Sequence, residues 1–370
     1  MIAPTVAYIN IDNLIHNYRL VEKLTKGASI IPIVKADAYN HGCIEVSRIL
    51  SSFSSLAYLG VAHTQEGKIL RENDIKKPIL VLSCILDDDL RIIYEYDFTP
   101  VLYSLSLIEK LANFAKWKGK RINTHIKIDT GMNRLGISYK DAQKIYETLK
   151  EYRDFLNVEG IMSHFCCSDS DDEFTSLQLK RFNDVVSFLE GNGLYFKYKH
   201  IANSAAILKF PQAYLNCTRP GIILYGYVPE KNISNPGFKP VLSIKSHIIH
   251  IHDLCPGEGV SYNRTFITKK KRKIGVIATG YADGFRRMLS NNFYVLIKGK
   301  KSPIIGNVCM DMVMCDLTHI DAEVGDEATV LGKDGEREID AWMLASKMNT
   351  IPYEILTSIG KRVYRVYVRK

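Results

Sequence analysis

Long hydrophobic stretches are absent from this chain of 370 residues, and no apolar run approaches the ~20 residues that a membrane-spanning helix needs. The N-terminus lacks the basic segment followed by an apolar segment that defines a secretory signal. We therefore expect no membrane partner, with a cytoplasmic location as the default. With 46% hydrophobic and 24% charged residues, the composition is that of an ordinary globular protein, which argues against disorder or a fibre.

Cys-x-x-Cys pairs are also absent. The 8 cysteines are spread along the chain, and most lie in apolar stretches, as Cys84 does after Val81-Leu-Ser. Without a secretory signal or paired spacing, reduced thiols are the simplest interpretation. We expect neither disulfides nor a metal site.

Acidic residues are fewer than basic ones, which gives a net charge of +9. The run Lys269-Lys-Lys-Arg-Lys273 supplies much of the excess. Such a run can bind nucleic acid or another anionic surface. It has no interleaved aromatic residues and belongs to no known module, so a solvated connection before a strand at 274–278 is the better interpretation. We expect no nucleic-acid partner.

Short β-branched apolar runs alternate with segments of helical period over the first two-thirds of the chain. This alternation predicts a parallel sheet, and eight such units predict an α/β fold of the TIM-barrel type, (β/α)8. The expected strands are 29–34, 57–61, 78–82, 99–102, 123–128, 157–162, 198–201 and 216–224. The expected helices include 106–118, 139–152 and 177–191.

Polar residues stand at or just beyond the C-terminal ends of most of these strands. In a TIM barrel those ends form the catalytic face, so we expect the side chains to meet there. The residues are Lys35, His63, Ser83, Lys127, Asp129, His164, Asn203, Ser204 and Arg219.

The alternation of apolar runs and helical segments ends near residue 240, where Pro236-Gly237 and Pro240 interrupt the chain. The later runs are short, alternating and broken by glycine, which predicts a mostly β domain. We therefore assign a barrel to 1–238 and a mostly-β domain to 239–370, with residues 1–10 as a candidate to pair with the second domain. Its expected strands are 243–251, 273–277, 293–297, 301–305, 312–317, 327–331 and 362–368, with a helix at 340–347.

Lys35 directly follows the apolar run Ile30-Ile-Pro-Ile-Val34. Taken alone, such a lysine is better explained as a surface residue at a strand end. At a barrel mouth, partial burial lowers the pKa of the amine and makes it a nucleophile that can form a Schiff base.

The segment Val34-Lys-Ala-Asp-Ala-Tyr-Asn-His-Gly42 resembles the one by which alanine racemases attach pyridoxal 5'-phosphate (PLP). Seven later segments resemble that family in the same order, so the resemblance covers nearly the whole chain. They are Lys127-Ile-Asp-Thr-Gly-Met-Asn-Arg-Leu-Gly136, His200-Ile-Ala-Asn-Ser204, Arg219-Pro-Gly-Ile222, Gly259-Val-Ser-Tyr262, Gly280-Tyr-Ala-Asp-Gly284, Gly306-Asn-Val-Cys-Met-Asp311 and Pro352-Tyr-Glu-Ile355.

The resemblance implies that Lys35 holds PLP and that Arg219, braced by His200, faces the pyridine nitrogen. An arginine cannot accept a proton there, so the ring is a weaker electron sink. The phosphate is assigned to hydroxyl and backbone donors after the last strands, where barrels commonly bind phosphate. The implied cofactor residues are Lys35, Tyr39, His164, Asn203, Ser204, Arg219, Gly221, Ile222 and Tyr353.

The resemblance also implies a second base, Tyr262. Racemisation removes a proton on one face of a planar carbanion and returns one on the other, so two opposed groups are expected, Lys35 and Tyr262. Because family members place the β domain of one subunit at the barrel mouth of another, a head-to-tail homodimer with composite sites follows. The implied substrate residues are Arg134, Met310, Asp311 and Tyr281.

The implied reaction interconverts L- and D-alanine and supplies D-alanine for cell-wall synthesis. Lys127 matches a position that is carbamylated in some members. Three features depart from the family pattern: Asn133 replaces a common glycine, Asn263-Arg264 follows Tyr262, and Tyr364 replaces a common proline. None removes a catalytic group.

Other functions remain open. A PLP amino-acid decarboxylase with the same architecture is disfavoured, because those enzymes place a carboxylate where Arg219 stands. A serine-preferring or broader racemase is not separated by these residues. A non-catalytic PLP-carrier barrel lacks a large second domain, and a nucleic-acid binder leaves the barrel-face residues unexplained.

Overall fold

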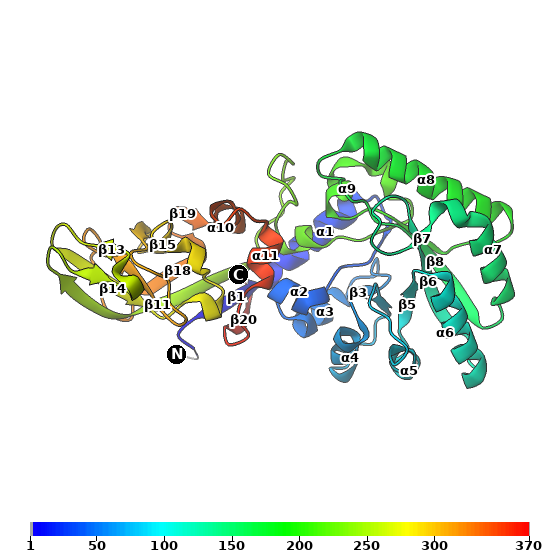
Figure 1. Cartoon of the computed structure of the whole chain (residues 1–370), viewed down its shortest axis with the longest axis horizontal. Helices are drawn as coiled ribbons and strands as arrows, with labels where there is room; N and C mark the ends of the chain where they lie inside the picture. The colour runs from blue at the N-terminus through cyan, green and yellow to red at the C-terminus, as the bar shows by residue number, and fades with distance from the viewer. Residues whose placement is uncertain (1–2, 370) are drawn as a thin grey trace.

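A parallel barrel forms the N-terminal part of the computed structural model, which describes residues 3–369 (Figure 1). Six strands run in the order β3-β4-β5-β6-β8-β9, and β2 pairs with β10. Backbone contacts close the ring, because Ile30 bridges Leu56 and the Arg219 N–H donates to the Ala202 carbonyl at 2.9 Å. The strands are β2 (Ser29–Ile30), β3 (Leu59–Val61), β4 (Ile79–Val81), β5 (Thr99–Leu102), β6 (Ile122–Asp129), β8 (Leu156–Met162), β9 (Tyr198–His200) and β10 (Cys217–Thr218). The predicted TIM-type barrel is confirmed.

Two expected strands are much shorter than predicted. The strand expected at 29–34 is a regular strand only over β2, with an isolated bridge from Ile33 to Gly60, and the one expected at 216–224 ends at Thr218. Pro32 and Pro220 lack the N–H that a ladder needs. After Pro220 the chain turns into a 3-10 helix at Ile222–Tyr225, which lies directly beside the predicted cofactor site.

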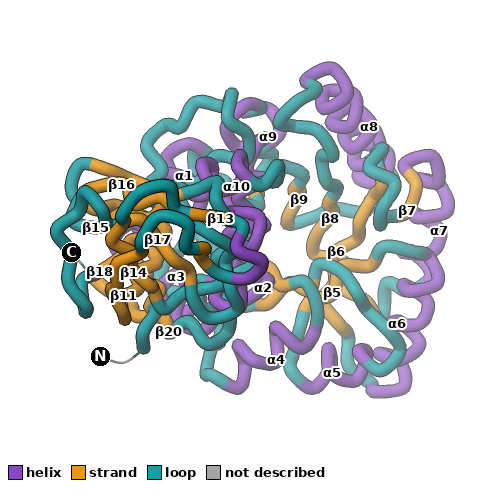
Figure 2. Tube along the Cα trace, turned by 60° about the vertical axis from the view of Figure 1, so that its left-hand side comes forward, coloured by secondary structure: helices purple, strands orange, loops and turns teal. Residues whose placement is uncertain are grey.

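Helices cover the outside of the barrel (Figure 2). The expected helix at 139–152 is divided into a 3-10 turn at Tyr139–Asp141 and α7. The expected helix at 177–191 begins earlier, because Asp171 accepts a hydrogen bond from the Phe174 N–H and caps α8. The helices are α1 (Ile11–Leu24), α3 (Cys43–Leu50), α4 (Thr64–Glu72), α5 (Asp89–Glu95), α6 (Leu105–Lys118), α7 (Ala142–Glu151), α8 (Asp172–Gly191) and α9 (Ser204–Lys209), with a short turn labelled α2 (Lys35–Asn40).

The second domain is mostly β, as predicted, and its strand pairs are antiparallel apart from the β1–β20 pair. β1 joins this sheet, since it pairs with β11 and with β20. The strands are β1 (Val6–Asn10), β11 (Leu242–Leu254), β12 (Gly259–Val260), β13 (Phe266–Ile267), β14 (Arg272–Ile277), β15 (Tyr294–Ile297), β16 (Lys300–Pro303), β17 (Val313–Asp316), β18 (Glu327–Asp334), β19 (Arg337–Ile339) and β20 (Tyr364–Val368). Helices α10 (Ala341–Lys347) and α11 (Pro352–Thr357) complete it, and β7 (Ile137–Ser138) extends the edge of β6 in the barrel.

Helix α1 ties the two parts together, because it leaves β1 in the second domain and runs along the barrel (Figure 1). Its buried residues Leu14, Tyr18 and Val21 belong to the main hydrophobic core, which continues into both parts. The amide of Asn17 donates to the carbonyls of Leu224 and Lys239 and so fixes the connection between the domains. The barrel mouth also contacts α11 of the second domain, because the Asn40 amide donates to the Leu356 carbonyl at 3.1 Å.

Candidate active site

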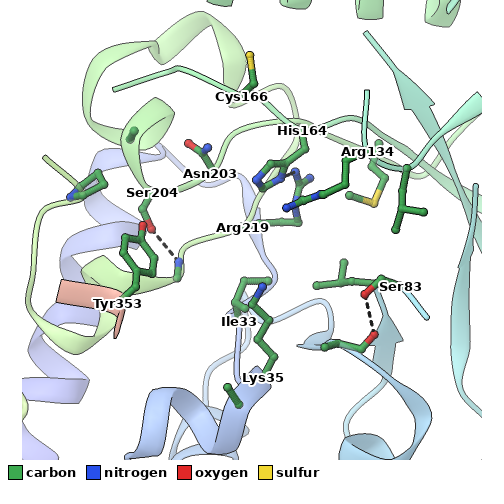
Figure 3. A pocket seen from close by; sticks show the side chains of 18 of the residues that line it. Ile33, Lys35, Ser83, Arg134, His164, Cys166, Asn203, Ser204, Arg219 and Tyr353 are labelled. Carbon is green, nitrogen blue, oxygen red and sulfur yellow. Dashed lines mark hydrogen bonds between the residues drawn. The ribbon is translucent and has the colours of Figure 1, made fainter. Parts of the chain in front are cut away.

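One cavity of about 620 Å³ opens at the C-terminal ends of the barrel strands. Figure 3 shows Tyr353 and Ser204 on one side of this cavity, Arg134 on the opposite side, and Lys35 near Arg219 between them. The predicted residues on its wall are Lys35, Tyr39, Ser83, Lys127, Arg134, His164, Asn203, Ser204, Arg219, Gly221 and Tyr353. The barrel strands and α11 thus bring together side chains that are separated by more than 300 positions in the sequence.

Lys35 begins a turn with unusual backbone geometry. The next five residues, Ala36 to Asn40, all have positive φ, between 52° and 64°. Left-handed geometry costs roughly 1–2 kcal/mol for each residue with a Cβ, so surrounding contacts must hold the turn. The carboxylate of Glu66 supplies one contact, since it accepts from the N–H groups of Ala36 and Ala62, both at 2.7 Å.

The Lys35 side chain lines the cavity and is partly exposed to solvent there. Burial, followed by the charge of Arg134, lowers the pKa of the Lys35 amine, and Glu66 opposes this effect. A lower pKa increases the fraction of neutral amine, which is the nucleophilic form. The local geometry therefore suits a lysine that forms a covalent bond with a carbonyl group.

Arg219 is almost completely buried and is held by five hydrogen bonds. Its Nη1 donates to Nδ1 and to the carbonyl of His200, at 2.7 and 2.8 Å. Its Nη2 donates to the carbonyls of Ser163 and Ile201, at 2.6 and 3.1 Å, and to Nδ1 of His164 at 3.2 Å. These bonds fix the plane of the guanidinium on the cavity wall, and the predicted brace from His200 is present.

His125 extends this network and was not predicted as a site residue. Because His200 accepts from Arg219 at Nδ1, its proton is on Nε2, which lies 2.8 Å from Nδ1 of His125. Burial is the main cause that lowers the pKa of His125 to about 3 and that of His200 well below its usual range. A Cβ at Gly160 would lie 2.5 Å from the His125 ring, so glycine makes room for it. Both histidines are neutral and have fixed tautomers.

Hydroxyl and backbone donors gather at the other end of the cavity. The Gly221 N–H donates to Ser204 Oγ at 2.9 Å, and a Cβ at Gly221 would lie 2.8 Å from Tyr39 Oη. Burial raises the pKa of the Tyr39 and Tyr353 hydroxyls, which keeps both as neutral donors. The side chain of Ile222 is fully buried and is not part of the wall, so this residue can act only through its backbone.

Further cations lie on the opposite wall. Burial, then Arg219 and Arg134, lower the pKa of Lys127 to about 8. Burial and the same arginines lower the pKa of His164 well below its usual range, so that it is a neutral ring. The loop that carries Arg134 is shaped by Asp129, which accepts from the N–H groups of Gly131 and Asn133. Asn133 has a φ of 55°, which asparagine tolerates where a glycine is common.

Apart from Tyr353, the candidates in the second domain do not line this cavity. Tyr262 is 71% exposed, Met310 is 51% exposed, and Tyr281 is 40% exposed. They lie on neighbouring loops, since the Tyr281 N–H donates to Cys309 and Asn307 donates to the carbonyl of Tyr262. Asp311 accepts from Arg362 at 2.6 Å. One chain therefore places these residues together but away from the barrel site.

The basic run is integrated into the second domain. Lys271 pairs with Asp253, Arg272 pairs with Asp316, and Lys273 donates to the carbonyl of Ala322. Over residues 3–369, no three histidine, cysteine, aspartate or glutamate side chains are grouped so as to hold a metal ion. Within that same range, no helix is long and apolar enough to cross a membrane.

Comparison with known proteins covers nearly the entire chain. A family model for the alanine racemase N-terminal domain matches residues 9–229, and one for the alanine racemase C-terminal domain matches residues 241–367. An alanine racemase of Carboxydothermus hydrogenoformans is 39% identical, with 99% of this chain and 100% of that protein covered. One of Thermodesulfovibrio yellowstonii is 41% identical, with 98% and 97% covered.

Solved structures agree. An alanine racemase of Clostridium difficile 630 superposes with a TM-score of 0.94 at 37% identity, covering 100% of this chain and 97% of that one. An alanine racemase of Bartonella henselae with covalently bound pyridoxal phosphate superposes with a TM-score of 0.90 at 28% identity, covering 99% and 100%. The chain therefore belongs to the alanine racemase family of enzymes.

Proposed function

We propose that this protein interconverts L- and D-alanine with PLP held by Lys35, and that Lys35 and Tyr262 act as the two bases. The main support is the single cavity in which Lys35 stands between an end rich in hydroxyl donors and a wall of cations. The reaction would provide D-alanine for the cell wall, in the cytoplasm.

The residues present fit PLP. Tyr39, Ser204 and Tyr353 offer hydroxyls, and the missing Cβ of Gly221 leaves room for a phosphate oxygen beside Tyr39 Oη. Lys35 would hold the cofactor covalently. A bound PLP supplies an electron-withdrawing ring that makes the Cα proton of an attached amino acid acidic. The Bartonella henselae relative with covalently bound pyridoxal phosphate supports this assignment.

Arg219 favours a racemase over a decarboxylase. Its guanidinium carries only donors and stays protonated, so it offers a pyridine nitrogen a hydrogen bond but cannot take a proton from it. A carboxylate at this position would instead stabilise a proton on that nitrogen. Five hydrogen bonds hold Arg219 in place, so its guanidinium keeps this position and no neighbouring side chain replaces it.

Arg134 would bind the substrate carboxylate as a fork of two parallel donors. With the carboxylate fixed, the Nζ of Lys35 would accept or return the Cα proton on one face. The phenol oxygen of Tyr262 would do so on the other face. Met310, Asp311 and Tyr281 would border the same position.

Tyr262 must come from another chain in this proposal. It is 71% exposed and lies outside the cavity wall of its own barrel. We therefore propose a head-to-tail homodimer in which the β domain of one subunit brings Tyr262, Tyr281, Met310 and Asp311 to the barrel of the partner. A serine-preferring racemase uses the same groups, and substrate comparison separates the two.

The test uses purified full-length protein loaded with PLP. The wild type should absorb visible light, become irreversibly labelled on borohydride reduction at Lys35, and equilibrate either enantiomer of alanine faster than serine. Tyr262→Phe should keep the absorption band and lose racemisation by roughly 100- to 10,000-fold, as expected when a general base is removed. A Tyr262→Phe enzyme that racemises at the wild-type rate would rule out the two-base assignment.

A further inference from the structure

Two consecutive cysteines, Cys166 and Cys167, lie in the loop after β8 at the rim of the active-site cavity. Cys166 is exposed and lines the cavity, Cys167 is partly exposed, and their Sγ atoms are 3.3 Å apart. In Figure 3 the sulfur of Cys166 points outward from the loop, at the side of the cavity opposite Lys35. The catalytic scheme above uses neither thiol.

Neighbouring residues hold the pair in position. Gln178 of α8 accepts from the backbone N–H of Cys166 at 3.1 Å and from its Sγ at 3.3 Å. The carbonyl of Cys167 accepts from the N–H groups of Ser170 and Asp171, at 3.0 and 2.8 Å. The two sulfurs are therefore preorganised, so a ligand that binds both loses little freedom on binding.

A direct disulfide between the two is unfavourable. Disulfide-linked residues usually have Cα atoms about 4.4–6.8 Å apart, whereas consecutive Cα atoms are ~3.8 Å apart. Burial and the neighbouring Cys167 thiol raise the pKa of Cys166 to about 11, so it is a poor nucleophile toward reagents that need a thiolate. A single soft atom that bonds both sulfurs avoids the strain, since two bonds of ~2.3 Å, the zinc–sulfur length, span up to about 4.6 Å.

We propose that Cys166 and Cys167 form a dithiol site for trivalent arsenicals, and that its occupancy closes the mouth of the cavity. With a monosubstituted arsenical of the form R–As=O, each sulfur forms one bond to arsenic and the As=O bond breaks. The oxygen leaves as water with both thiol protons, so no oxidant or reductant is needed. Binding is independent of the proposed racemase activity, whereas the blocking effect rests on it.

The same loop connects the thiols to the PLP end of the cavity. Ser168 donates from Oγ to Oδ1 of Asn203 at 2.9 Å. That same oxygen accepts from the Ala206 N–H and caps α9, which begins at Ser204. An arsenic atom bound by Cys166 and Cys167 therefore lies at the rim, directly before the residue that contacts the α9 cap.

The experiment treats the PLP-loaded full-length protein with phenylarsine oxide and measures retained arsenical by intact mass after gel filtration. We expect one equivalent on the wild type, released by a small dithiol and not by a monothiol. Cys166→Ser and Cys167→Ser should each retain the probe at least ~100-fold more weakly, because the second bond is intramolecular in the wild type. Cys84→Ser is the matched control, since Cys84 is an exposed thiol on the same cavity, and it should bind as the wild type does.

Retention by either Cys166→Ser or Cys167→Ser at the wild-type level, or no retention by the wild type, would overturn the site. In a second arm, racemisation is measured with and without the arsenical and expressed relative to the untreated rate of each variant. The arsenical should inhibit the wild type and Cys84→Ser, and it should leave the rates of Cys166→Ser and Cys167→Ser unchanged. Stoichiometric binding without inhibition overturns the blocking effect alone. An untreated wild type without activity overturns the proposed function and leaves the mass result valid.

Discussion

The barrel and the β domain hold their predicted site residues in opposite ways. In the barrel, Arg219 is 3% exposed and makes five hydrogen bonds within its own chain. In the β domain, Tyr262 and Met310 are mostly exposed. The polar groups of the barrel site are already buried and hydrogen-bonded within one chain, so we expect cofactor binding to need no partner subunit. In the proposed dimer, the exposed groups of the β domain acquire their surroundings from the second chain, so we expect cofactor binding and racemisation to separate experimentally.

The largest expected effect comes from mixing two inactive variants. In the proposed dimer, a Lys35→Ala subunit paired with a Tyr262→Phe subunit forms one site with both substitutions and one intact site. Random assortment of equal amounts should therefore restore about a quarter of wild-type activity from two nearly inactive parents. Racemisation is assayed after the mixed subunits have been dissociated and reassociated.

The matched control for this mixture pairs Lys35→Ala with Arg219→Lys. Both residues lie in the barrel, so neither site of that mixed dimer is intact, and no activity should return. Recovery in this control, or none with Tyr262→Phe, contradicts a composite site.

Arg219→Lys tests how much the Arg219 network contributes to the stability of the barrel. A lysine has one ammonium group and cannot serve three buried carbonyls and two imidazoles together. Each buried acceptor that is left without a donor costs about 1–3 kcal/mol, so we expect the free energy of unfolding to fall by at least ~2 kcal/mol. Urea unfolding measures it, with the exposed Arg153→Lys as control. A change below ~0.5 kcal/mol would mean that the network contributes little.

Much of the barrel site could be predicted because each residue has a signal of its own. Lys35, Lys127, His164 and Arg219 are polar residues directly after or near the ends of apolar runs, and parallel strands place such ends on one face. The β-domain residues carry no such signal. Tyr262 is one of 21 tyrosines, and only the resemblance separated it from an ordinary aromatic residue.

His125 and Glu66 could not be predicted, because their roles exist only through their partners. His125 lies inside β6 and resembles any buried strand histidine until His200 is seen beside it. Glu66 lies in the first turn of α4, where an acidic residue is already explained by the helix dipole. The left-handed turn after Lys35 was also unexpected, since Ala36 and Ala38 have a Cβ that disfavours it.

Gly160→Ala examines the part of the barrel network that the sequence did not reveal. The added methyl would lie 2.5 Å from the His125 ring and force it away from His200, at a cost of roughly 1–3 kcal/mol. Gly191→Ala is the control, because a Cβ there meets nothing within 4 Å and the residue ends α8. That variant should be unchanged or slightly more stable. Thermal unfolding of both PLP-loaded proteins gives the comparison, and equal stability would contradict the close fit around His125.

The smallest expected effect is a difference in pH dependence between a barrel lysine and a β-domain lysine. Burial lowers the pKa of Lys127 from 10.5 to about 8 in the folded chain, so between these values the unfolded state binds more protons. Stability relative to Lys127→Met should therefore rise from pH 8 to 10.5. A hydrogen bond to Asp326 raises the pKa of the exposed Lys298, so its stabilising contribution is full below 10.5 and is lost as the pH rises above it. Urea titrations of both methionine variants in buffer free of carbon dioxide, which reacts with neutral amines, should give slopes of opposite sign. Two slopes of the same sign would mean that the Lys127 amine is as well solvated as a surface lysine.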